Sequence, residues 1–164
     1  MEQVYNKRTL GLVVPAFLIH NIEEIISFKS FTLYYDYTDF TYTSLALGIT
    51  LLSAFVVVLY RFADKYKFGE YALHFNAGLV VAMLLNAFFP HILGAIYLKA
   101  YVPGLITAIV LILPFAFYFF KHEIRPNLHI KSLKYSLVLV PVGILLLTAL
   151  SLGISLLVTP LIFG

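Results

Sequence analysis

This sequence of 164 residues contains no cysteine and few charged residues. Without cysteine the chain has no disulfide framework, no thiol nucleophile and no thiolate metal site, so any metal must be held by histidine and carboxylate side chains. Charged residues make up only 12% of the chain, whereas 62% of the residues are hydrophobic and lie in long blocks. This balance is typical of an integral membrane protein. The formal net charge of +3 is too small and too scattered to predict nucleic-acid binding.

The chain also lacks the short motifs of several enzyme classes. It contains no glycine-rich phosphate loop, no G-x-S-x-G nucleophile elbow and no H-E-x-x-H zinc motif. It shows no internal repeat either, and we expect residues 1–164 to form a single domain.

Five segments are long and apolar enough to cross a bilayer as helices. A helix needs about 20 residues to cross the hydrocarbon core. The segments lie at about 9–28, 42–62, 70–98, 103–120 and 135–162. The sequence therefore predicts an all-α membrane protein, a bundle of five transmembrane helices in contact with the lipid bilayer.

The basic residues indicate how this bundle is oriented. Most of the 11 lysines and arginines fall at one side of the predicted spans, namely Lys7, Arg8, Arg61, Lys65, Lys67, Lys121, Arg125, Lys131 and Lys134. The other side carries Lys29 and Lys99. The positive-inside rule then predicts a cytoplasmic N-terminus and a C-terminus outside.

A polar cluster, His20-Asn-Ile-Glu-Glu24, interrupts the first span. The basic pair and the ten apolar residues before it resemble a signal peptide, but no small-x-small cleavage site follows. Ten helical residues rise only about 15 Å, half of the hydrocarbon core, so the segment crosses only if it includes the cluster. His20, Glu23 and Glu24 share one helix face by their spacing. That face is expected to look inward, because a charged carboxylate facing lipid costs on the order of 3 kcal/mol.

The third span supplies residues at the same depth. Asn86 and His91 lie in its outer half, whereas His74 lies about 25 Å of helix rise away from His91 and is too distant to share a site. Pro90 lies between Asn86 and His91 and removes a backbone donor, which frees the carbonyl of Asn86. A membrane helix tolerates this where side chains or water satisfy that carbonyl. Pro103-Gly104 is a turn signal that places Tyr101 and Thr107 near the same outer layer, where Tyr101 is expected to be a hydrogen-bond donor.

The ordered motifs carry a resemblance. They are His20-Asn-Ile-Glu23-Glu24 in the first span, then Asn86-x4-His91, then Tyr101-x-Pro103-Gly104-x-x-Thr107. This combination resembles the HXXEE family of small bacterial membrane proteins, from the first span through the fourth. The resemblance implies a five-span protein of the bacterial cytoplasmic membrane that is built around these acidic and histidine positions and has been proposed to be an enzyme.

A metal site is the first chemistry that the residues themselves fit. His20 and His91, with one or both of Glu23 and Glu24, would form a set of two histidines and a carboxylate that suits zinc or iron(II). Zinc held there would lower the pKa of a bound water to about 7 and make it a nucleophile. The corresponding hypothesis is a metal-dependent hydrolase that acts on a lipid or another amphiphile from the outer leaflet.

Two other classes of function stay open. Two neighbouring carboxylates in a poor dielectric cannot both ionise cheaply, so Glu23 and Glu24 could form an acid and base pair without a metal, with Asn86, His91 and Tyr101 beside them. Intramembrane glutamate proteases of the CAAX type are an analogy for this chemistry, although they place an arginine where this chain has Phe28. The remaining class is a small transporter or lipid-binding module with a buried proton relay, or a network that only ties helices together.

Several features are expected to be interfacial. The tyrosine-rich segment 28–42 is interpreted as an aromatic belt, with a lid over the polar layer as the alternative. His122 and His129 are expected to be solvated among the basic residues of the inner loop. The small-residue faces of the spans leave a monomer and a dimer equally open.

Overall fold

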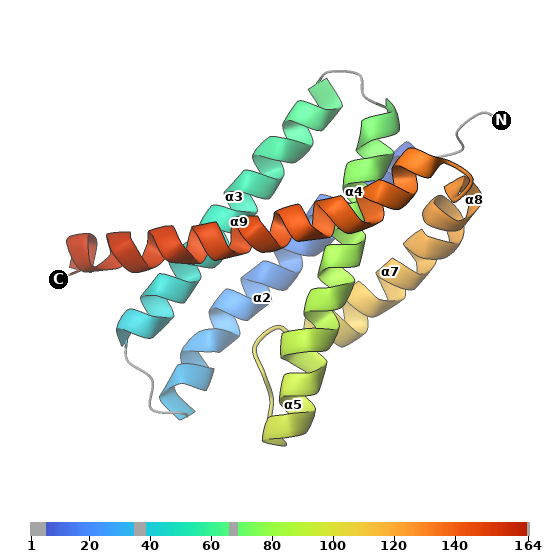
Figure 1. The fold of residues 1–164 in the computed structure, drawn as a ribbon. Coiled ribbons are helices and arrows are strands. Elements are labelled where there is room, and N and C mark those ends of the chain that lie inside the picture. The colour runs from blue at the N-terminus through green and yellow to red at the C-terminus, as the bar shows by residue number, and fades with distance from the viewer. Residues whose placement is uncertain (1–5, 35–38, 66–68, 164) are drawn as a thin grey trace.

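The computed structural model describes residues 6–34, 39–65 and 69–163, and every regular element in these ranges is a helix (Figure 1). In chain order they are α1 (Lys7–Gly11), α2 (Val13–Tyr34), α3 (Asp39–Lys65), α4 (Gly69–Asn86), the π-helix η1 (Ala87–Ile92), α5 (Leu93–Leu98), α6 (Leu105–Thr107), the π-helix η2 (Ala108–Ile112), α7 (Leu113–Phe119), the π-helix η3 (Phe120–Ile124), α8 (Arg125–Asn127) and α9 (Lys131–Phe163).

Five stretches of this structure are long and apolar enough to cross a membrane. They are Lys7–Phe31, Tyr42–Phe62, Ala72–Leu98, Leu105–Asn127 and Lys131–Leu161. They correspond one by one to the expected segments, so the five long helices and the all-helical class are confirmed for the described residues.

The fourth stretch continues beyond residue 120, where the sequence analysis ended it. The extension is held by burial of two polar residues that the apolar pattern does not include. Glu123 and Asn127 are buried, the amide of Asn6 donates to Oε2 of Glu123 at 3.0 Å, and Nδ2 of Asn127 donates to the carbonyl of Glu123 at 2.8 Å. Polar contacts thus extend the helix past its apolar part.

Small residues allow the helices to approach one another closely. The long helix α9 runs obliquely across α3 and α4 (Figure 1). At the crossing with α3, a Cβ atom added to Gly48 would lie 2.7 Å from a side-chain carbon of Leu152. At the crossing with α4, a Cβ atom added to Gly78 would lie still closer to Cβ of Val140. Such contacts depend on van der Waals packing, because lipid tails are as apolar as the side chains they replace.

The outer surface of the bundle is strongly apolar. Large exposed side chains include Phe89 and Tyr97 near the end of the third stretch and Leu157 and Leu161 on α9. In water such a surface would promote aggregation, whereas a bilayer solvates it. The surface therefore fits contact with lipid, as expected from the sequence.

The third stretch does not remain a regular α-helix. Pro90 lies inside the π-helix η1, between α4 and α5. Proline has no amide hydrogen to donate, and a wider turn accommodates the lost bond. After α5 the backbone takes left-handed conformations at Lys99 (φ 50°) and Gly104 (φ 83°), which turn the chain back toward the bundle before α6 begins. These irregular segments surround the polar layer.

Candidate functional site

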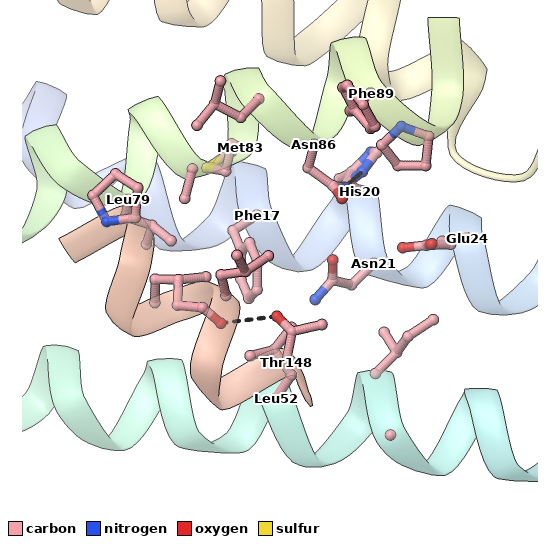
Figure 2. Close-up of a pocket in the computed structure, with 18 of the residues that line it drawn as sticks. Phe17, His20, Asn21, Glu24, Leu52, Leu79, Met83, Asn86, Phe89 and Thr148 are labelled. Atoms are coloured by element: carbon pink, nitrogen blue, oxygen red, sulfur yellow. Dashed lines mark hydrogen bonds between the residues drawn. The ribbon is translucent and has the colours of Figure 1, made fainter. Parts of the chain in front are cut away.

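Two helices bring the predicted polar residues together. His20, Glu23 and Glu24 come from α2, and Asn86 and His91 come from α4 and η1. Figure 2 shows His20 and Asn86 converging from their two helices, with Glu24 about one turn further along α2.

The two histidines meet through the same ring atom. Nε2 of His20 lies 3.2 Å from Nε2 of His91, and the rings are nearly perpendicular, with centroids 4.8 Å apart. Both side chains are buried, at 2% and 1% exposure. Nδ2 of Asn86 lies 3.2 Å from Nε2 of His20 and 3.0 Å from Nε2 of His91, so its amide group can donate one hydrogen to each.

Hydrogen bonds assign the proton of His20 to its other nitrogen. Nδ1 of His20 lies 2.7 Å from Oγ1 of Thr107, and the same hydroxyl donates to Oε2 of Glu23 at 2.6 Å. A hydroxyl has one hydrogen, so Thr107 must accept from Nδ1–H of His20. The lone pair of His20 is therefore on Nε2 and points at His91.

The backbone after α5 orients His91. Nδ1 of His91 is buried without a hydrogen bond of standard geometry among the described residues, and the backbone of Pro103 lies beside the ring in a looser geometry. A proline backbone offers only an acceptor, which favours a proton on Nδ1 and a lone pair on Nε2. Gly104 leaves room for this packing, because an added Cβ would lie 2.5 Å from Cε1 of His91 and 3.0 Å from Cε1 of His20.

Glu23 accepts hydrogen bonds at both carboxylate oxygens. Its Oε1 accepts from the hydroxyl of Tyr101 at 2.6 Å and from the amide of Ile106 at 3.3 Å. Its Oε2 accepts from the amide and the hydroxyl of Thr107, at 2.8 and 2.6 Å. These amides open the helix that begins at Leu105, so Glu23 caps the helix start from a neighbouring helix, where a negative charge is favourable.

Tyr101 completes the environment of Glu23. It lies in the turn between the third and fourth stretches, and its side chain is 41% exposed. Burial of the ring raises the pKa of the phenol, and the hydrogen bond that it donates to Glu23 raises this pKa further. Tyr101 is therefore a neutral donor, as the sequence analysis expected, and its partner is Glu23.

Glu24 points in another direction from its neighbour. One carboxylate oxygen of Glu24 and one ring nitrogen of each of His20 and His91 all lie within 4.8 Å of one another. Within the described part of the chain, the side chain of Glu24 makes no hydrogen bond. The group of potential metal ligands therefore contains Glu24 and leaves out Glu23.

The spacing of the two histidine nitrogens fits a small divalent cation. Zinc bound to nitrogen at about 2.0–2.1 Å in tetrahedral geometry holds two ligand nitrogens about 3.3 Å apart. The two Nε2 atoms, at 3.2 Å, present lone pairs to each other, which repel unless hydrogens or a cation lie beside them. Asn86 supplies the hydrogens here, and a metal would take their place. Thr107 and Glu23 behind His20 resemble the outer partners that orient metal-bound histidines.

A cavity of about 540 Å³ lies beside this group, between α2, α3, α4 and α9. Its polar lining consists of His20, Asn21, Glu24, Asn86 and Thr148, and the rest is apolar. Figure 2 shows Glu24 and Asn21 on the α2 wall of this space and Thr148 on α9. A cavity of this size is in the usual range for small-molecule sites.

Other polar residues of the sequence lie elsewhere. Asn21 donates to Oγ of Ser53 at 2.8 Å and so ties α2 to α3. His74 bonds with Ser136 of α9 at 3.1 Å, in the first half of α4, away from the site as expected. His122 and His129 are exposed, also as expected. Residues 35–38 and the side chains of 32–41 lie outside the described part of the chain, so the belt and lid interpretations of segment 28–42 stay untested.

Sequence analysis placed Thr107 near the outer layer without a role and used Gly104 only as a turn signal. Both lie in the centre of the observed network, Thr107 between Glu23 and His20, and Gly104 against both histidine rings. Their order in the motif Tyr101-x-Pro103-Gly104-x-x-Thr107 was the available signal, because a glycine turn before a helix places the next residues at its first turn.

Comparison with known proteins identifies one family for this chain. A search of curated proteins and a search of solved structures each found no match to the chain. Residues 11–119, about two thirds of the chain, match the family described as protein of unknown function with HXXEE motif. That range includes His20, Glu23, Glu24, Asn86, His91 and Thr107. The chain therefore belongs to the HXXEE family.

Proposed function

We propose that this chain is a membrane-embedded, metal-dependent hydrolase that acts on a lipid or another amphiphile. His20, Glu24 and His91 would hold the metal, zinc or iron(II). The observation that supports this most directly is the meeting of their three ligand atoms within 4.8 Å at the wall of a largely apolar cavity. Two imidazoles and one carboxylate are a common set for hydrolytic zinc.

The residues around the ligands have distinct proposed roles. A divalent metal at this place would supply Lewis-acid activation of water or of a carbonyl or phosphoryl oxygen. Asn86, freed from the two Nε2 atoms, would orient water or substrate with its amide. Glu23 and Thr107 would keep the proton on Nδ1 of His20, so that Nε2 stays available as a ligand.

We place the site in the outer half of the bundle, with the N-terminus in the cytoplasm. The distribution of lysine and arginine supports this orientation. The relation to small bacterial membrane proteins supports the bacterial cytoplasmic membrane as the location. A substrate that dissolves in the outer leaflet would then reach the cavity without crossing the membrane.

The hydrogen bonds weigh against a pair of glutamates that share acid and base work without a metal. The two carboxylate oxygens of Glu23 accept hydrogen bonds from Tyr101, Ile106 and Thr107. Glu23 therefore has a structural role. Of the two glutamates, only Glu24 lines the cavity. If no metal binds, the alternative functions are a metal-free reaction at Glu24 and a proton relay through His20.

Elemental analysis tests the proposal. The protein would be purified without a histidine tag and without chelators, next to a His20→Ala, His91→Ala double variant. The matched control removes two exposed histidines, His122→Ala and His129→Ala. We expect about one zinc or iron per chain in the wild type and in the control, and none in the double variant. No metal in the wild type, or equal metal in all three proteins, would contradict the proposal.

A further inference from the structure

The cavity beside the candidate metal ligands is almost entirely apolar. Apart from its few polar residues, it is lined by aliphatic and aromatic side chains, among them Phe17, Leu52, Leu79, Met83 and Ile144. The polar atoms of His20, Glu24 and Asn86 belong to one region of its wall, where α2 and α4 approach each other (Figure 2). A ligand that fits this arrangement has one long apolar part and one polar end.

The volume limits how large the apolar part can be. A methylene group occupies about as much space as one water molecule in the liquid, roughly 30 Å³. A cavity of 540 Å³ therefore holds on the order of 18 such groups. That is the size of one long alkyl chain. Two chains of a diacyl lipid would need about twice this space.

The cavity also has a wall that faces lipid. Leu85 of α4, Phe89 of η1 and Leu145 of α9 line it, and they are 59%, 79% and 70% exposed. In a membrane these exposed side chains contact acyl chains and not water. The cavity therefore borders the bilayer at α4 and α9, the side from which an apolar chain would enter without passing through water.

We infer that this cavity binds the single alkyl chain of a bilayer amphiphile, with the polar head at His20, Glu24 and Asn86. The apolar part of the cavity continues from the head toward Leu79, which precedes Asn86 on α4 by about 10 Å of helix rise. The chain would lie along this direction, under the crossing of α9. The identity of the ligand as a substrate rests on the proposed function, whereas binding of the chain does not.

Photolabelling tests the inference. The probe is palmitic acid with a diazirine in its chain, incorporated with the protein into phosphatidylcholine vesicles. We expect crosslinks on Leu79 and Met83 of α4 and on Ile144 of α9, which line the cavity and are buried from the bilayer. A diacyl phosphatidylcholine with the same diazirine chain serves as the second probe and should label these three residues much less.

Two matched variants test whether the cavity itself is labelled: one fills the cavity, and the other adds the same side chain outside it. Ala82 lines the cavity, whereas Ala54 of α3 is exposed and does not line it. Ala82→Phe should reduce labelling by about tenfold, which is about 1.4 kcal/mol, and Ala54→Phe should leave it unchanged. Thr148→Phe fills the same cavity from α9 and replaces Ala82→Phe if that variant does not fold.

The outcomes separate this inference from the proposed function. Metal bound in the wild type without labelling of the cavity would overturn the inference and leave the metal site standing. Labelling that Ala82→Phe or Thr148→Phe abolishes, in a protein without metal, would support the inference and contradict the metal centre. Equal labelling by the diacyl probe would overturn the commitment to a single chain.

Discussion

Glu23 and Glu24 are adjacent in the chain but have different surroundings. Successive helical residues are rotated by about 100°, so the two carboxylates leave α2 in different directions. Glu23 reaches the amides and hydroxyls of Tyr101, Ile106 and Thr107. Glu24 reaches the cavity and the histidines. One glutamate therefore orients the site, and the other is the proposed ligand.

Substitution by glutamine should separate these roles. Because Glu24→Gln removes a negatively charged ligand, we expect it to abolish stable metal binding. Glu23→Gln acts through Thr107 and His20, so it should weaken metal affinity by about 10- to 100-fold while some binding remains. Competition with a fluorescent chelator measures both affinities. If Glu24→Gln binds as tightly as the wild type, or if Glu23→Gln is the more damaging variant, the assignment of roles is wrong.

Gly104 is required at its position by the backbone conformation and by the histidine rings beside it. Its φ of 83° is unfavourable for other residues, and an added Cβ would lie 2.5 Å from the ring of His91. Gly104→Ala should therefore displace the histidine ring, reduce metal binding at least tenfold and lower thermal stability. Gly143→Ala in α9 is the control, because an added Cβ there meets no atom within 4 Å. Thermal unfolding and metal content of the two variants provide the comparison, and equal behaviour would contradict it.

Among the helices, the most informative element is η1, the π-helix that contains Pro90 and His91. A π-turn inserts an extra residue and so rotates every later side chain relative to a regular helix. His91 lies inside η1 and is buried against His20, so its direction depends on the geometry of this turn. The local irregularity thus has a direct consequence for the geometry of the site.

Replacement of Pro90 should show this dependence. Pro90→Ala restores the missing amide donor, so part of η1 should return to regular α-helix and turn His91 away from His20. We expect unchanged helix content by circular dichroism together with a loss of metal affinity of at least tenfold. Pro160→Ala, in the last turns of α9 and exposed, should change neither quantity. Full metal affinity in Pro90→Ala would show that His91 does not depend on the π-turn.

At the scale of the whole molecule, the absence of cysteine offers a direct test of orientation. We expect Lys99→Cys, in the turn after α5, to react with a membrane-impermeant maleimide in intact cells. His129→Cys, between α8 and α9, should react only after permeabilisation. Both native side chains are exposed, so accessibility in the folded protein does not distinguish them. The reverse pattern of labelling would invert the proposed topology and place the site in the inner half.

The described arrangement also explains which parts of the protein follow from the sequence alone. Helix number and approximate bounds could be predicted because the bilayer requires about 20 apolar residues for each span. The cost of charge in lipid predicted that the face with His20, Glu23 and Glu24 looks inward, and position along the third span placed Asn86 and His91 at the same depth. These rules depend on local composition, and no knowledge of helix packing is needed to apply them.

Tertiary structure decided everything that depends on helix rotation and close approach. The different partners of Glu23 and Glu24, the meeting of the two Nε2 atoms and the bridging position of Thr107 result from packing of α2 against η1 and α6. The cavity results from the oblique crossing of α9, which no residue pattern in a single helix specifies. Residue type and depth are thus determined by the solvent, whereas the chemistry of the site is determined by contacts between segments far apart in the chain.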